Sequence, residues 1–257
     1  MSDAILSIEH VSKSFAVDGQ NVPVLKDINL EVKKGEFITI VGQSGCGKST
    51  LLKLVAGIVS YSEGDIIRNG VRVTEPGTDC GMVFQEHRLL PWLRIKKNIG
   101  FGLRNMPKAK KDALVEQHLN LVNLKGFENA WPHQLSGGMS QRAAIARGLV
   151  TNPDILLLDE PLGALDALTR IQLQKEILRI WKEEKTTMLL VTHDIDEAIF
   201  LGERVVVMSA RPGEIKEIIT IPAGVGADRS SSDFAHFKDK IYRHFFAVDA
   251  QHEEYNI

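Results

Sequence analysis

Short runs of apolar, often β-branched residues alternate along this chain with longer segments of helical periodicity. The runs FITIV at 37–41, MLLVT at 188–192 and RVVVM at 204–208 have the length and composition of buried strands. The segments STLLKLVAGI at 49–58 and ALTRIQLQKEILRIWKEE at 167–184 carry apolar residues at helical spacing. Because strands that alternate with helices are typical of βαβ units, the pattern predicts an α/β fold with a mainly parallel sheet.

The alternation stops between about residues 86 and 150. Strand signals fade there, and 109–123 and 139–150 have the pattern of helices, which predicts an inserted helical subdomain. A Gly/Ser-rich stretch at 222–231 precedes apolar residues near helical spacing, and these predict a C-terminal helix packed on the body: Phe234, Phe237, Ile241 and Phe245. We expect one domain over 1–257, made of a core at about 1–85 and 151–221, the helical subdomain at about 86–150, and an extension at 222–257.

Composition narrows the class of protein. With 44% apolar and 25% charged residues, the 257-residue chain is expected to be globular rather than disordered. Its net charge of −2 provides no long-range field that would attract nucleic acid. The aliphatic run ILLL at 155–158 is far too short to span a membrane, and MSDAILSIEH lacks the regions of a signal peptide, so we expect a cytosolic chain. Cys46 and Cys80 make neither a disulfide framework nor a metal-ligand set.

A glycine-rich stretch, VGQSGCGKST at 41–50, overlaps the end of the run FITIV. Gly42, Gly47, Lys48 and Ser49 match the spacing GxxxxGK[ST], between a predicted strand and a predicted helix. Glycines let successive backbone N–H groups turn toward an anion without a Cβ in the way, and the helix N-terminus adds partial positive charge. The stretch therefore predicts a phosphate cradle rather than a glycine-rich turn that caps an ordinary helix.

Each residue of this phosphate loop, residues 42–50, has an expected place. Lys48 would lie between the β- and γ-phosphates of a nucleotide, and the Ser49 hydroxyl would bind Mg²⁺, with Thr50 one position further along the helix. Cys46 occupies a variable position, where a tolerated small residue is favoured over a redox switch. The residues expected to contact the nucleotide here are Gly42, Gln43, Ser44, Gly45, Cys46, Gly47, Lys48, Ser49 and Thr50.

An acidic element decides between nucleotide binding and hydrolysis. ILLLDE at 155–160 is an apolar strand that ends in two carboxylates, the Walker B pattern. Asp159 is suited to hold Mg²⁺, usually through water, and Glu160 to orient and polarise the water that attacks the γ-phosphorus. An acidic pair at a strand end would mean little alone, but together with a phosphate loop it predicts hydrolysis.

The stretch LSGGMSQR at 135–142 predicts a second anion site, one without a lysine. Ser136 is suited to cap the helix that follows, and Gly137 and Gly138 leave the start of that helix bare. With this stretch the chain resembles the ATP-binding cassette (ABC) ATPases, whose signature is LSGGQ; Met139 replaces the glutamine and leaves the Ser-Gly-Gly core intact. The resemblance implies a P-loop NTPase (RecA-like) core, an antiparallel N-terminal β region and an inserted α-helical subdomain.

Further motifs of this family occur in order up to about residue 221. They are Gln85 in VFQEHRLLPW (the Q-loop), Asp166 in GALD (the D-loop), His193 in VTHD (the switch histidine) and Phe15 in VSKSF, the aromatic residue expected to stack on adenine. Gly163 stands where many members carry Ser, so only Asp166 is carried over from GALD, as a residue that the resemblance implies to contact the nucleotide. The alternatives are a core role for Phe15, since Tyr is commoner at its position, and a structural role for His193.

The resemblance implies that two chains share each nucleotide. A loose phosphoryl-transfer transition state spreads negative charge over the γ-oxygens, so catalysis consists mainly of positioning and countercharge. ATP and Mg²⁺ are the implied cofactors, and the ATP-bound state is implied to be a head-to-tail homodimer in which Ser136, Gly137 and Gly138 of a second chain close over the γ-phosphate. The implied catalytic residues are Lys48, Gln85, Glu160 and His193, and the implied Mg²⁺ ligands are Ser49, Gln85 and Asp159.

The resemblance also implies a membrane partner. In the family, the region after the Q-loop forms a groove that grips a cytoplasmic helix of the integral membrane permease, and here the apolar run LLPWL at 89–93 follows Gln85. Trp92 is expected to contact that permease, with packing of LLPWL inside the helical subdomain as the alternative. The implied location is the cytoplasmic face of the cell membrane, with an extracytoplasmic solute-binding protein as an indirect partner and no nucleic acid.

The cargo depends on analogy within one branch of the family. FQEHRLLPWL, PHQLSGGM, DEPLGALDALTR and SARPGEI resemble the nitrate/sulfonate/taurine importers, and DALTR favours the aliphatic-sulfonate ATPases. Nitrate, taurine and thiamine-precursor import remain alternatives. A non-transport ABC ATPase would need long coiled-coil insertions or two cassettes in one chain, and a GTPase would need an NKxD-like guanine-binding motif; the sequence has none of these.

Overall fold

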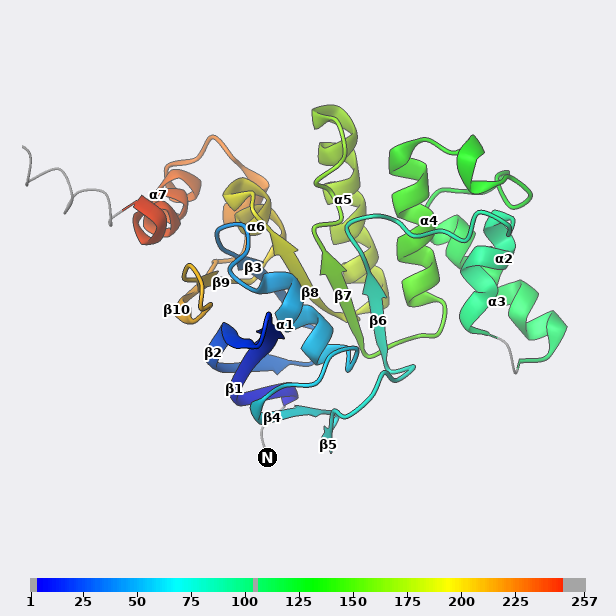
Figure 1. Cartoon of the computed structure of the whole chain (residues 1–257). Helices are drawn as coiled ribbons and strands as arrows, with labels where there is room; N and C mark the ends of the chain where they lie inside the picture. The colour runs from blue at the N-terminus through cyan, green and yellow to red at the C-terminus, as the bar shows by residue number, and fades with distance from the viewer. Residues whose placement is uncertain (1–3, 104–105, 247–257) are drawn as a thin grey trace, which may run out of the picture. The chain divides into compact units, whose positions relative to one another are not determined.

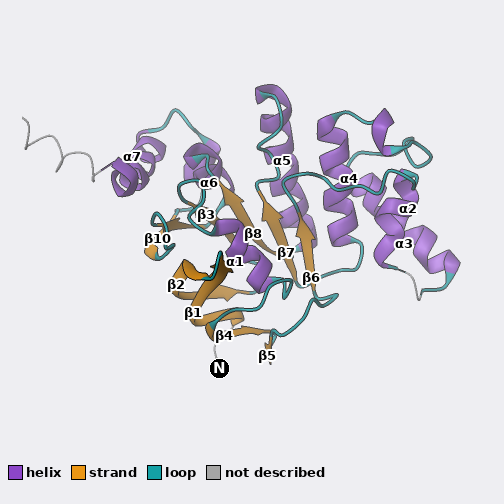
Figure 2. Ribbon diagram, in the orientation of Figure 1, coloured by secondary structure: helices purple, strands orange, loops and turns teal. Residues whose placement is uncertain are grey.

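The computed structural model describes residues 4–103 and 106–246, and these residues form an α/β fold (Figure 2). The chain divides into two compact units, residues 1–76 with 189–257, and residues 77–188. Both units contain parallel strand pairs, and the N-terminal region forms an antiparallel sheet. The predicted fold class is therefore confirmed, whereas the predicted domain limits stay a prediction.

The N-terminal sheet of the first unit is antiparallel throughout, with the strand order β2-β1-β4-β5. Along β2, the buried residues Ile28, Leu30 and Val32 alternate with exposed ones, which is the period of a strand with one face on a core. Because this alternation fixes which face is buried, it also fixes the register with β1. The strands are β1 (Ala4–Val17), β2 (Gln20–Lys33), β4 (Glu63–Arg68) and β5 (Val71–Arg72).

A second group of strands in the first unit carries the phosphate loop. β3 (Phe37–Val41) runs parallel to β9 (Arg204–Met208), and β10 (Ile215–Thr220) pairs with β9 in the antiparallel direction. β8 (Thr187–Thr192), which belongs to this unit from Leu189 onward, is the other neighbour of β3. All residues of β3 are buried, as expected for a parallel strand that is covered on both faces. The three predicted strands FITIV, MLLVT and RVVVM are thus confirmed.

The helices of the first unit are α1 (Lys48–Val55), α6 (Ile195–Leu201), the short η3 (Val225–Ala227) and α7 (Ser232–Phe246). α1 ends earlier than the pattern STLLKLVAGI predicts, because Gly57 adopts a φ of 74°, which leaves the right-handed helical conformation. α7, drawn in red in Figure 1, is the predicted C-terminal helix. Its Phe234 and Ile241 are buried in one apolar cluster with Ala198 and Ile199 of α6.

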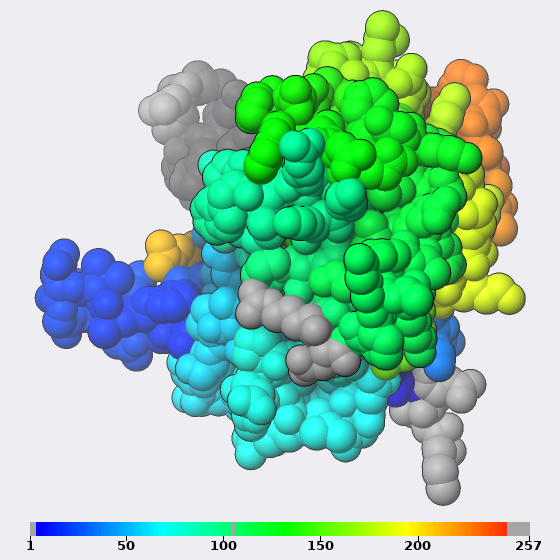
Figure 3. Space-filling view, turned by 90° about the vertical axis from the view of Figure 1, so that its right-hand side faces the viewer, coloured from blue at the N-terminus to red at the C-terminus, as the bar shows by residue number. Residues whose placement is uncertain are grey.

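The second unit combines a parallel strand pair with the helical insertion. β6 (Cys80–Val83) runs parallel to β7 (Ile155–Asp159), and the described residues between these strands form helices and loops (Figure 2). Figure 3 looks onto this helical part, drawn in green. The helices predicted at 109–123 and 139–150 correspond to α3 and α4. The helices of the unit are α2 (Ile95–Ile99), η1 (Gly100–Gly102), α3 (Lys108–Leu121), η2 (Pro132–Gln134), α4 (Gly137–Leu149) and α5 (Ala167–Glu184).

Across residues 4–103 and 106–246, we find no helix that combines the length and the apolar character needed to cross a bilayer.

Candidate functional site

The phosphate loop connects β3 to α1. Gly47, the residue before α1, has no side chain with which to cap the helix, so the first backbone N–H groups of α1 have no cap from that position. Its φ of 104° is left-handed, a conformation that glycine adopts without strain. A Cβ at this position would also lie 2.6 Å from Leu25 Cδ2. Both the backbone conformation and the available space therefore require glycine here.

Lys48 is the first residue of α1 and is 4% exposed. Its Nζ donates to the carbonyl oxygens of Gly42 at 2.7 Å and Gln43 at 3.0 Å. A buried ammonium needs polar partners, and a phosphate oxygen is a stronger partner than a neutral carbonyl. The loop thus holds its cation ready for an anion, which is the arrangement that the motif predicts.

Gly213, in the loop at 209–214 between β9 and β10, packs against the phosphate loop at Cys46. A Cβ on Gly213 would overlap with the carbonyl oxygen of Cys46, so only glycine permits this close approach. The Gly213 N–H donates to Val24 O at 2.8 Å, and its carbonyl accepts from Lys26 N at 3.0 Å. The sequence reasoning missed Gly213, although a Pro-Gly pair after a predicted strand is a turn signal.

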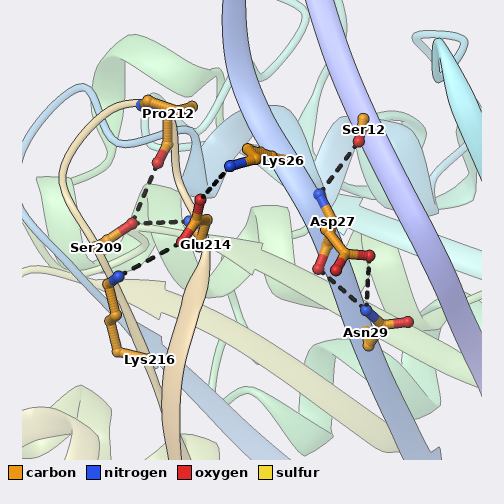
Figure 4. A network of polar contacts seen from close by, with 8 residues as sticks. All are labelled: Ser12, Lys26, Asp27, Asn29, Ser209, Pro212, Glu214 and Lys216. Carbon is orange, nitrogen blue, oxygen red and sulfur yellow. Dashed lines mark hydrogen bonds and ion pairs between the residues drawn. The ribbon is translucent and has the colours of Figure 1, made fainter.

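Polar contacts fix this loop to β2 (Figure 4). Ser209 Oγ donates to Pro212 O at 3.1 Å and accepts from Glu214 N at 2.9 Å. The Glu214 carboxylate pairs with Lys26 at 3.3 Å and with Lys216 at 3.4 Å. The hydrogen bond and charge of Lys26, followed by those of Lys216, hold the pKa of Glu214 below its usual value. Gly213 is consequently held in place on both sides.

Cys46 is buried inside the phosphate loop. Burial raises the pKa of its thiol above the usual value, although the charge of Lys48 acts in the opposite direction. A thiol that stays protonated is a poor nucleophile, so the environment favours the small tolerated residue over the redox switch.

His193 follows β8 and faces the phosphate loop. A pocket of about 460 Å³ is lined by residues 41–44, at the start of the phosphate loop, and by 193–196. The segment after the histidine is ordered by Asp194, whose carboxylate accepts from Glu197 N at 3.1 Å and caps α6. The structure thus brings the predicted switch histidine to the predicted phosphate cradle, although its catalytic role stays a prediction.

Phe15 lies on β1, opposite Val22 of β2. Its side chain is 37% exposed rather than enclosed in a core, and Lys13 Nζ lies 4.8 Å from the ring centroid. An exposed aromatic ring is available for stacking. Stacking of this ring on adenine remains a prediction.

The acidic pair lies in the second unit, at the end of β7. Asp159 is the last residue of the strand and is 6% exposed. Glu160 follows with a φ of 45°, a left-handed conformation that is strained for a non-glycine residue and occurs often at functional sites. A Cβ at Gly163 would lie 3.8 Å from Glu160 Oε2 and 3.9 Å from Gln85 Nε2. The predicted base, the Q-loop glutamine and the D-loop therefore converge within this unit.

The signature stretch starts α4, as predicted. Ser136 is the N-cap, and its Oγ accepts a hydrogen bond from Met139 N at 3.3 Å. Ser136 and Gly137 are exposed, whereas Gly138 is buried. A Cβ on Gly138 would lie 2.6 Å from Thr169 Cγ2, so Gly138 packs closely against the start of α5.

Asp166 has a structural task that the sequence reasoning did not assign. It is the N-cap of α5, and its Oδ1 accepts from Thr169 N at 3.0 Å. Hydrogen bonds from Thr169 hold the pKa of this carboxyl below its usual value. A contact between Asp166 and a nucleotide stays a prediction.

The segment after Gln85 is held by two polar residues that the sequence reasoning also missed. Arg147 of α4 donates to the carbonyl oxygens of Arg88 at 2.7 Å and His87 at 3.0 Å. Asn98, which is fully buried, accepts from Leu90 N at 2.7 Å and donates to Leu90 O at 3.1 Å. No helix is predicted at 95–99 from the sequence, so no local pattern indicates Asn98.

The run LLPWL is divided between the interior and the surface. Leu89 is 6% exposed, whereas Trp92 is 67% exposed. An exposed indole offers a partner a large apolar face and an N–H donor. Leu89 thus follows the alternative of internal packing, and Trp92 remains available to a partner.

Comparisons with known proteins identify the family. The family model described as ABC transporter matches residues 25–163. The chain is 50% identical over 240 residues to the aliphatic sulfonates import ATP-binding protein SsuB of Bacillus thuringiensis subsp. konkukian, an alignment that covers 93% of this chain and 95% of that protein. It is 45% identical over 227 residues to the taurine import ATP-binding protein TauB of Roseobacter denitrificans, with coverage of 87% and 85%.

A solved structure is also similar. It is described as the dimeric structure of a post-hydrolysis state of the ATP-binding cassette MJ0796 bound to ADP and Pi. The TM-score is 0.74 at 31% sequence identity, and the alignment covers 85% of this chain and 99% of that chain.

Proposed function

Because the chain belongs to the ABC transporter family and is an ATPase of that family, we propose that it powers the import of an aliphatic sulfonate. The assignment of this cargo is supported by the 50% identity to a sulfonate import protein over 93% of the chain. Taurine, which is itself a small sulfonate, is the second candidate because of the 45% identity to a taurine import protein. Selection of the cargo would belong to the permease and to an extracytoplasmic solute-binding protein.

The nucleotide would be held by the phosphate loop, with Phe15 stacked on its base. Lys48 would exchange its carbonyl partners for phosphate oxygens and supply countercharge. The oxygens of Ser49, Gln85 and Asp159 are hard donors of the kind that Mg²⁺ prefers, so the residues fit this ion. When bound, Mg²⁺ would neutralise charge on the phosphates.

Hydrolysis would depend on Glu160 as the general base. Its carboxylate would take a proton from the attacking water, and its strained backbone conformation supports an active-site role. Gln85 lies on the same side of Gly163, where it would help to position that water. His193 would contact the γ-phosphate from the edge of the phosphate loop.

The second half of each site would come from another copy of the chain. Ser136 and Gly137 are exposed at the start of α4 and present backbone N–H groups without a lysine. A head-to-tail homodimer would bring them to the γ-phosphate of the partner's nucleotide. Trp92 would contact the permease at the cytoplasmic face of the membrane.

Growth on defined sulfur sources tests the cargo. In the organism that carries this gene, we expect deletion to abolish growth on ethanesulfonate and to leave growth on sulfate unchanged. The wild-type gene should restore growth, and Glu160→Gln, which keeps the fold but lacks the base, should not. Loss of growth on taurine alone would favour the second candidate, and full growth of the deletion strain on both sulfonates would refute the proposal.

A further inference from the structure

The C-terminal helix α7 forms one wall of the pocket beside the phosphate loop. The other walls are residues 41–44 and the segment 193–196, and α7 contributes Lys238, Tyr242 and Phe245. All of these residues belong to the first unit. A helix that lies outside every motif of the sequence thus reaches the edge of the predicted γ-phosphate site.

An apolar face holds α7 in its place. Phe234 and Ile241 are buried in the cluster that includes residues of β3, β9 and α6, and Phe237 and Phe245 pack partly against it. This burial of large apolar side chains provides the adhesion of the helix to the body. The polar side chains of α7 are therefore available for a task other than attachment.

Two groups of ion pairs join α7 to different elements. Lys238 Nζ contacts both oxygens of Asp196, with Oδ1 at 2.7 Å and Oδ2 at 3.0 Å, and this pairing raises the pKa of Lys238. Further along the helix, Lys240 and His244 both contact Glu217 of β10 at 2.6 Å. The first group reaches the pocket, and the second lies outside it. The second group can therefore serve as a control for the first, because both lie on the same helix.

Asp196 and His193 lie in one short segment that is joined by hydrogen bonds. It lies in the first turn of α6, three positions after the histidine. Asp194, between them, caps α6 through Glu197 N at 3.1 Å and donates its own N–H to Thr192 Oγ1 at 3.0 Å. Because these hydrogen bonds join the segment 192–197, we expect a displacement of Asp196 to displace His193 as well.

We infer that Lys238 is a positioning residue for ATP hydrolysis, which holds the segment carrying His193 against the phosphate loop through its contact with Asp196. The inference rests on the proposed contact of His193 with the γ-phosphate. Both side chains of the pair are more than a third exposed, and a pair of this kind contributes little to the stability of a fold. A small error in the position of a catalytic group, in contrast, has a large effect on rate.

Steady-state ATPase kinetics of the full-length chain test the inference. We expect Lys238→Ala to lower kcat about tenfold, with KM for ATP and the thermal unfolding midpoint close to those of the wild type. Lys238→Arg, which keeps the charge and the reach, should retain most of kcat. The matched control is Lys240→Ala, which removes a contact of the same helix with β10 and should leave kcat unchanged.

Asp196→Asn tests the same contact from the other side and should show the same loss of kcat, even if Lys238→Ala does not fold. A wild-type kcat for both variants would overturn the inference, and so would an equal loss in Lys240→Ala, because the effect would then come from release of the whole helix. A wild-type kcat for His193→Ala would instead contradict the proposed role of His193 itself.

Discussion

The phosphate loop and the signature stretch are both glycine-rich starts of helices, but they are built differently. At the phosphate loop, the residue before α1 is a left-handed glycine, and a buried lysine is folded onto two carbonyl oxygens. At the signature stretch, Ser136 caps α4 with its own hydroxyl, and the neighbouring Gly137 is exposed. The first carries its own cation, and at the second the Met139 N–H already has a side-chain partner.

This difference indicates which part of nucleotide binding each of the two elements is suited to perform. A buried ammonium that donates to two neutral carbonyl oxygens gains much when an anion arrives, so the phosphate loop is suited to bind nucleotide within one chain. A capped helix start gains less, because a ligand oxygen must compete with a hydrogen bond that already exists. The signature stretch is therefore suited to recognise a phosphate that another chain already holds in position.

Lys48→Ala should have the largest effect. The substitution removes the countercharge of the transferring phosphoryl group, and we expect kcat/KM for ATP to fall by about 10³-fold. ATP affinity should fall as well, because the lysine contacts ground state and transition state alike. Lys53→Ala, on the same helix but in its last turn, is the control and should leave both constants unchanged. If Lys48→Ala bound ATP as tightly as the wild type, the cradle would not depend on its cation.

Ser136→Arg should lower kcat by about 10²-fold, because a bulky side chain at the exposed cap blocks the approach of a second chain's nucleotide. Unlike Lys48→Ala, it should leave ATP binding by the single chain intact, as measured with a fluorescent ATP analogue. Mixing Ser136→Arg with Lys48→Ala chains should restore one complete composite site and part of the turnover. Failure of every mixture to recover activity would argue against the division of work between the elements.

Gly213→Ala should have an intermediate effect, on the phosphate loop alone. The added Cβ must displace the Cys46 carbonyl, and overpacking of this kind costs about 1.4 kcal/mol, or a factor of about ten in ATP affinity. Ala210→Ser, in the same loop but exposed, is the control. Isothermal titration with ATP measures the difference. An unchanged affinity would mean that the phosphate loop still binds ATP when the Cys46 carbonyl is displaced.

Much of the fold was predictable because its signals are local. The runs FITIV and RVVVM match β3 and β9 residue for residue, and α5 covers the whole predicted segment at 167–184. Ser136 was also identified correctly as an N-cap. In each case the hydrophobic period or the capping residue lies within the element itself.

The residues that sequence reasoning missed act across long sequence distances. Gly213 touches Cys46, and Arg147 binds carbonyl groups of the Q-loop segment, so neither contact has a local pattern. The left-handed backbone of Glu160 is likewise imposed by its surroundings and not by its residue type. Motifs located the chemistry of the candidate site, but they could not indicate which residues hold those motifs in position.

The smallest expected effect distinguishes the two caps beside the signature stretch. Ser136→Ala should lower the free energy of unfolding by about 1 kcal/mol at any pH, because a hydroxyl cap carries no charge. Asp166→Ala should behave differently, because hydrogen bonds from Thr169 hold the pKa of Asp166 below its usual value in the folded chain. That stabilisation is complete above the unfolded pKa of about 3.9 and is lost as the pH falls through the folded pKa. Urea unfolding at pH 7 and at lower pH measures the free energy of unfolding. The difference in this free energy between wild type and Asp166→Ala should become smaller in acid, while the difference between wild type and Ser136→Ala should stay constant. If the difference for Ser136→Ala became smaller to the same extent, the signature helix would depend on a nearby charge and would resemble the phosphate loop more than its hydroxyl cap indicates.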